Sequence, residues 1–175
     1  MFTYVFYPNV LLIDHFFSLI PFIAPEKFLL FSQKNLIMRF LFDPKTTTSG
    51  DFQDIILPIH NLKNVRTLAF DQFDHFVYWI DGKSIKRTNA SGLYPIETLL
   101  YPHQSVQPID LVIDPYARIL FWTCNITNSI NATRIIGKPI MVGTVHHNPA
   151  TQDRPRLLAY HQRTKYVEKK NLNSL

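Results

Sequence analysis

An aromatic pair followed by a turn occurs twice in the chain at a fixed spacing. The first copy, "VYWID", follows Asp71, and the second, "LFWTC", follows Asp114. Trp79 and Trp122 are 43 residues apart, as are the two aspartates. A period of about 40–45 residues is typical of β-propellers, whose units are blades of four antiparallel strands. This repeat limits the possible folds more than any other feature of the sequence.

Each copy contains four segments rich in β-branched and aromatic residues, which favour strands. In the first copy they are 65–70, 76–80, 84–88 and 96–100, and in the second 109–113, 119–122, 130–134 and 140–145. Asp81-Gly82 suits a tight hairpin, and Asp114-Pro115 favours a turn after a first strand. The sequence therefore predicts two full four-stranded blades.

Partial units flank these blades. Upstream, "FLLFSQKNLIMRF" repeats a second and a third strand, with Phe31 placed 48 residues before Trp79. Downstream, "RPRLLAYHQRTKYV" repeats a first strand and its turn, with His161 in place of the aspartate. We therefore expect an all-β fold, a partial propeller over residues 25–170, with a tail at 171–175.

Residues 1–24 stand apart as an apolar N-terminal segment of uncertain role. Pro8, Asp14 and Pro21 interrupt the run, and no Lys or Arg precedes Lys27. A secretory signal has a positive start and an unbroken apolar region, and a membrane span needs about 20 apolar residues. A signal or anchor, a segment packed on the edge of the domain, and a mistaken start of the gene model all remain open.

The two aromatic motifs resemble the YWTD repeat of low-density-lipoprotein-receptor-related ectodomains. The third-strand "IKR" and "INATR" are similar to the I-x-R of that repeat. The stretches "FLLFSQK", "DIILPIHNLKNVR", "FWTCNITNSIN" and "QDRPR" resemble the fourth propeller of the Wnt co-receptor members. The resemblance covers roughly residues 28–160 and implies part of a six-bladed ring, which in the family precedes a Cys-rich module.

The resemblance also implies roles for the motif residues. The tyrosine and tryptophan of the repeat pack the sheets, and its aspartate ties neighbouring blades through buried hydrogen bonds. These roles fall on Tyr78, Trp79 and Asp81, and on Phe121 and Trp122. Cys124 stands at the aspartate position of the second copy, so the tie is in doubt there. A buried aspartate needs donors close by, and we expect them around Asp81.

Compartment signals in the sequence are mixed. The single cysteine excludes an internal disulfide framework and weakly favours a reducing compartment. Three N-x-[ST] sequons, at Asn89, Asn125 and Asn131, favour an extracellular or cell-surface protein and possible N-glycosylation. In a secreted protein each sequon should lie on the surface.

Other chemistry finds little support. The net charge of +5 is scattered, except in the basic segment 161–170, so no nucleic-acid module is predicted. His146 and His147 are adjacent on a strand and point to opposite faces, so we expect no metal site. Asp110 and Asp114 do not form a pair with divergent environments, and no motif of a nucleophile or of phosphate binding occurs. No catalytic residue and no cofactor are expected.

The sequence thus predicts a non-enzymatic, protein-binding propeller fragment that resembles a Wnt co-receptor ectodomain. By resemblance, its partners would be secreted proteins, either Wnt-type ligands or antagonists, with membrane attachment only as part of a longer receptor. One alternative is a free-standing secreted propeller that completes its ring by self-association. Others are an incomplete or degraded receptor copy without independent function, and a small hydrolase on a propeller scaffold.

Overall fold

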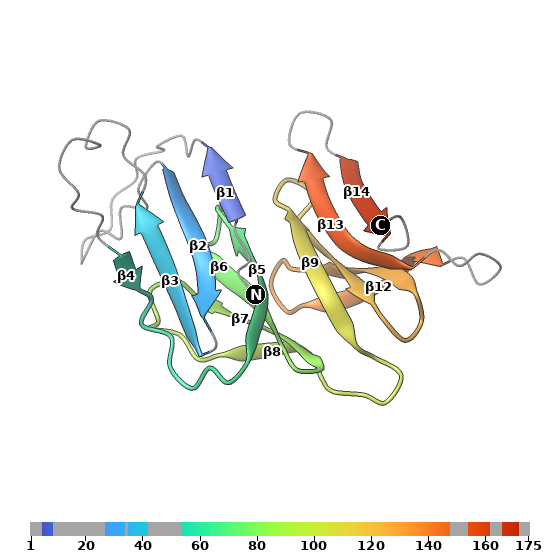
Figure 1. Ribbon diagram of the computed structural model, residues 1–175, viewed down its shortest axis with the longest axis horizontal. Helices are drawn as coiled ribbons and strands as arrows, with labels where there is room; N and C mark the ends of the chain where they lie inside the picture. The colour runs from blue at the N-terminus through green and yellow to red at the C-terminus, as the bar shows by residue number, and fades with distance from the viewer. Residues whose placement is uncertain are drawn as a thin grey trace.

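The computed structural model describes residues 5–8, 27–33, 35–41, 54–147, 154–161 and 166–171. In these ranges fourteen β-strands form four antiparallel sheets (Figure 1). Helices long and apolar enough to cross a bilayer do not occur in them. The prediction of an all-β partial propeller is confirmed.

The two full blades lie where the repeat predicts them. The second blade has the order β5-β6-β7-β8, and the third has the order β9-β10-β11-β12. Their bounds are Val65–Asp71, Phe76–Asp81, Ser84–Asn89 and Glu97–Leu100 for β5 to β8, and Pro108–Asp114, Ile119–Cys124, Ser129–Arg134 and Ile140–His147 for β9 to β12. Asp81 pairs with Ser84 across the expected hairpin, in which Gly82 adopts a left-handed φ of 63°.

The first blade contains more strands than the sequence predicts. The expected second and third strands are β2 (Lys27–Gln33) and β3 (Leu36–Leu41). The structure adds β1 (Val5–Pro8) and β4 (Asp54–Ile56), and the four strands pair in the order β1-β2-β3-β4. Strand β1 belongs to the apolar segment 1–24, so a boundary after residue 24 divides a sheet. The rest of that segment lies outside the described residues.

The last unit is a two-stranded sheet. Strand β13 (Pro155–His161) is the expected first strand, and it pairs with β14 (Tyr166–Asn171). The inner strands β1, β5, β9 and β13 follow one another from blade to blade, and the described sheets form an open arc (Figure 1).

The core consists of two apolar clusters, one on each side of the second blade. Trp79 packs in the cluster shared with Phe28 and Leu30 of the first blade. Tyr78 packs in the cluster shared with Leu120 and Trp122 of the third blade. Successive residues of a strand point to opposite faces, so the aromatic pair supplies one ring to each neighbouring interface. Burying such a ring removes roughly 150–250 Å² from water, worth about 4 kcal/mol.

Candidate binding surface and the contacts that hold it

Two equivalent turns place aromatic side chains in solvent. The Asp71 carboxylate accepts the backbone N–H of Phe73 at 3.0 Å, and Asp114 accepts that of Tyr116 at 3.0 Å. Each aspartate therefore closes the turn after the first strand of its blade. Phe73 and Tyr116 are 52% and 57% exposed, and their rings meet edge to face with centroids 5.8 Å apart. The pair links the second and third blades at the surface.

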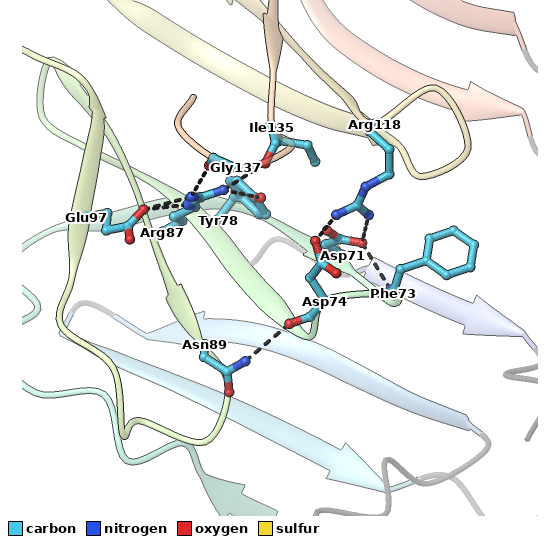
Figure 2. A network of polar contacts seen from close by, with 10 residues as sticks. All are labelled: Asp71, Phe73, Asp74, Tyr78, Arg87, Asn89, Glu97, Arg118, Ile135 and Gly137. Atoms are coloured by element: carbon cyan, nitrogen blue, oxygen red, sulfur yellow. Dashed lines mark hydrogen bonds and ion pairs between the residues drawn. The ribbon is translucent and has the colours of Figure 1, made fainter. Parts of the chain in front are cut away.

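Arg118 ties these two turns together. It has a left-handed backbone with a φ of 57°, and its guanidinium reaches back to the second blade. One nitrogen donates to Asp71 Oδ1 at 2.5 Å, and the other donates to Asp74 (Figure 2). The Asp71 side chain is fully buried, whereas that of Asp74 is 54% exposed. Burial alone would lower the pKa of Arg118, but the hydrogen bond to Asp71 and the two negative charges raise it.

Arg87 on β7 is a second link between the same blades. Its guanidinium donates to the carbonyl oxygens of Ile135 and Gly137 on the third blade, each at 3.0 Å (Figure 2). It also donates to Glu97 at 2.8 Å and to the hydroxyl of Tyr78 at 3.4 Å. Burial raises the pKa of Tyr78 to about 12, although Arg87 opposes the shift. The link therefore connects a buried phenol with two backbone carbonyls of the next blade.

The inner strands carry a third set of ties. Thr67 and Asp110 are 43 residues apart, and each lies at an irregularity in the pairing of a first strand. Thr67 donates to the carbonyl of Ile109 at 3.2 Å, and Asp110 accepts the N–H of Leu158 at 2.7 Å. Burial raises the pKa of Asp110, against the effect of this hydrogen bond. Each tie crosses from one blade to the next.

Asp81 has the donor that we expected, but in its own blade. The contact described for it is an ion pair at 2.5 Å with Lys86, across the β6–β7 hairpin. Asp71 and Arg118 make the inter-blade tie that the resemblance assigned to Asp81. Cys124 is buried, and burial alone would raise the pKa of its thiol. Hydrogen bonds with Gln107 and with Ile126 and Thr127 of the β10–β11 turn outweigh that effect, so the pKa of the thiol is lowered.

The third blade departs from the second at its third strand. Phe121 is half-buried, and Trp122 is buried with its indole N–H donating to Thr133 at 3.2 Å. Arg134, matched to the arginine of the repeat from the sequence, pairs with Ile119 and is exposed. The longer β10–β11 turn shifts the register, so the third blade has no arginine in the position that Arg87 occupies in the second.

Comparisons with known proteins agree with this geometry. The chain is 40% identical over 148 residues to mouse low-density lipoprotein receptor-related protein 5, and over 147 residues to the human protein. Each match covers 82% of this chain. The chain resembles the low-density lipoprotein receptor-related proteins. It spans only 9% of the mouse relative's length and 8% of the human one's. No protein-family model matches the chain.

Solved structures show the same propeller architecture. A nidogen/laminin complex superposes with a TM-score of 0.61 at 23% identity, covering 83% of this chain and 53% of that chain. A virginiamycin B lyase from Staphylococcus aureus superposes with a TM-score of 0.54 at 14% identity, covering 85% and 53%. At these identities the likeness concerns the fold alone. The fold of this chain thus occurs in proteins with different names and low sequence identity.

The three sequons of the chain differ in accessibility. Asn89, the last residue of β7, and Asn125, in the β10–β11 turn, are half-buried. Asn131 is only 3% exposed, since its amide donates to Ser129 at 3.2 Å and accepts from Thr144 at 2.8 Å. The expectation that every sequon lies on the surface is therefore wrong for Asn131, which is part of the sheet's polar packing.

The histidine pair of β12 lies apart from the ties. The imidazole of His146 is 2.9 Å from the ammonium of Lys169 on β14. Within the described ranges no group of three or more His, Cys, Asp or Glu residues is placed to hold a metal ion. His146 instead contacts the last sheet through Lys169.

Sequence reasoning did not identify the residues of the turn surface. Phe73 and Tyr116 are themselves 43 residues apart, so the repeat that revealed the aspartates could also have revealed them. Arg118 had no such signal, because its counterpart one period earlier is His75. Both residues do share a left-handed backbone, with φ of 56° at His75.

Proposed function

We propose that the chain is an extracellular propeller segment that binds secreted proteins, as in a Wnt co-receptor ectodomain, and that it is not an enzyme. The observation that carries this proposal is the 40% identity to low-density lipoprotein receptor-related protein 5 over 82% of the chain. The partners would be Wnt-type ligands or their antagonists. Membrane attachment would come from a longer receptor that contains this segment.

The turn surface, which we define as Phe73, Asp74, Tyr116 and Arg118, is the best candidate for the contact. Aromatic and arginine side chains dominate the binding energy of many protein interfaces, and here the two aromatic rings are exposed while the Arg118 side chain is 14% exposed. The Arg118 guanidinium lies 5.8 Å from the Phe73 ring centroid, so the charge and the ring present one surface. Because Arg118 forms an ion pair with the buried Asp71, the surface is ordered before a partner binds.

Binding of the full chain to immobilised Wnt-pathway proteins, measured by biolayer interferometry, tests the proposal. Phe73→Ala and Tyr116→Ala should each weaken binding about tenfold or more. Tyr101→Ala, on an exposed tyrosine remote from the turns, is the matched control and should have no effect. Lack of binding to every Wnt-type ligand and antagonist would contradict the function, and equal losses for all three variants would contradict the surface.

Self-association is a second candidate, favoured by the open arc of the described sheets. An unpaired blade face leaves apolar surface in water, and a second copy could cover it. Sedimentation equilibrium distinguishes the two possibilities. A stable oligomer that does not bind the secreted ligands would favour a free-standing propeller, and a monomer would exclude it.

A further inference from the structure

The outer strand of the third blade is unusually apolar for an edge. Among the described strands, β12 pairs with β11 and is the outermost strand of its sheet. Its exposed side chains include Ile140, Met141, Val142 and Val145. None of its eight residues is an Asp, Glu, Lys or Arg. Edge strands are usually short or protected by charges, as is β8 in the second blade, which has four residues and begins with Glu97.

A pocket of about 350 Å³ opens on one face of this blade. The register places Cys124, Ser129 and His147 in one row across three strands, and Trp122, Asn131 and Thr144 in the next. These residues, together with Met141 and the turn at 105–106, line the pocket.

The polar groups of the pocket are largely satisfied by one another. Thr127 and Ser129 share a hydrogen bond of 2.6 Å. Asn131 donates to Ser129, and Thr144 donates to Asn131. What the pocket offers to a ligand is therefore mainly the apolar surface of Met141 and Val106, next to the buried Trp122, which suits one bulky apolar side chain.

The charge around the pocket is mostly positive, and the nearby carboxylates, Glu97 and Glu168, lie next to Arg87 and Lys169. The sequence from Pro115 to His147 contains no Asp or Glu. Arg134 and Lys138 are exposed at the start of β12, and Lys169 lies beside its end. A partner that follows the strand would meet basic residues at both ends, so complementarity requires an acidic partner.

We propose that the β12 surface, defined as β12 and the adjoining pocket, binds an acidic, extended segment of another protein through one buried aromatic or aliphatic side chain. A second copy of this chain fits less well, because antiparallel β12 strands would bring like charges together. An anionic bilayer also fits less well, because a concave pocket accepts a single side chain and presents no apolar face to lipid. The site is separate from the turn surface and does not depend on the ligands of the proposed function.

A peptide array with the full chain is the direct test. Short peptides carry Asp and Glu flanks around one central position that is varied through all residues, and a matched set carries Lys flanks. Trp, Phe, Leu, Ile and Met at the centre of the acidic set should bind best. No binding, binding without preference at the central position, or preference for Lys flanks would overturn the proposal.

Variants locate the site. Met141 is 54% exposed, so Met141→Glu should fold while placing a negative charge at the mouth of the pocket. Met141→Glu should weaken the binding of the peptide with acidic flanks and a central tryptophan about tenfold. Leu93→Glu, at a side chain that is 84% exposed on the second blade, is the control and should leave binding unchanged. Equal losses of peptide binding in the two variants would indicate charge attraction alone and would overturn the proposal. Binding to phosphatidylserine vesicles but not to peptides would indicate a membrane-binding surface and would also overturn it.

Discussion

Asp71 and Asp74 both accept a hydrogen bond from Arg118, but they differ in burial. Asp71→Ala should lower the free energy of unfolding by about 3 kcal/mol, because it removes one partner of a buried ion pair. Asp74→Ala removes an exposed partner and should lower the free energy of unfolding by less than about 1 kcal/mol. Urea denaturation of the two variants measures the difference, and equal losses would contradict the role of Asp71 as the inter-blade tie.

Gly92 and Gly82 both have a left-handed backbone, with φ of 71° and 63°. A Cβ atom at Gly92 would lie 2.2 Å from the carbonyl oxygen of Pro58, whereas one at Gly82 would meet nothing within 4 Å. Gly82→Ala should therefore cost only the backbone strain, about 1 kcal/mol. Gly92→Ala should cost clearly more, since the segment at Pro58 must move. Thermal unfolding compares them, and a Gly92→Ala variant as stable as Gly82→Ala would show that this contact is loose.

Tyr78 should make the fold sensitive to alkali. Its pKa is raised to about 12 in the fold, whereas an unfolded tyrosine has a pKa of about 10. The neutral phenol is favoured in the fold, so its contribution is complete below about pH 10 and is lost as the pH rises towards 12, by roughly 2 kcal/mol. Denaturant unfolding at several pH values should show this loss.

Tyr78→Phe should remove that part of the alkaline loss, and Tyr94→Phe, at an exposed tyrosine, should not. The pKa of Tyr160 is also raised to about 12, so Tyr160→Phe separates its contribution. A loss that persists unchanged in Tyr78→Phe would contradict the assignment.

At the scale of the strand, the third strands of the two full blades differ in how they contact the next blade. Arg87 on β7 bonds two carbonyls of the next blade, whereas Arg134 on β11 is exposed. Arg87→Ala leaves those two carbonyls and Glu97 without their donor. It should lower the free energy of unfolding by about 2–3 kcal/mol. Arg134→Ala should change stability by less than about 0.5 kcal/mol. Urea denaturation measures both changes. A large loss of stability for Arg134→Ala would contradict the exposed position that the strand register gives this arginine.

The strands of the repeat could be predicted from sequence because aromatic and β-branched runs recur at one spacing with turn residues between them. Strand β4 has only three residues, and β1 lies in an apolar segment without the alternation of apolar and polar residues typical of a strand, so neither has a local pattern that predicts it. The ties escaped prediction for another reason. Arg118 lies 47 residues from Asp71 in sequence, and the different lengths of the two hairpins displace Arg134 from the position of the repeat. Contacts between blades depend on register, which composition does not determine.

At the scale of the whole molecule, the second blade is the best-protected part, because an apolar cluster covers each of its faces. Hydrogen exchange followed by mass spectrometry should find the slowest amides in β6. Amides of the two-stranded β13–β14 sheet should exchange faster than those of either full blade, because fewer neighbours cover it. Equal protection of β6 and β13 would show that the fourth sheet is stabilised by contacts beyond those described.

The division of each aromatic pair between two interfaces also affects how such a chain can gain or lose length. A segment cut between Trp79 and Trp122 and rejoined one period later keeps a tryptophan facing backward at the junction. A cut that shortens or lengthens a strand places a mismatched side chain in a packed interface, whereas a difference confined to loops, as in the 48 residues from Phe31 to Trp79, does not. Unequal recombination in whole multiples of 43 residues would therefore preserve the cores, while the Arg87 and Arg118 ties would be lost at the new junction unless the incoming unit supplied their partners.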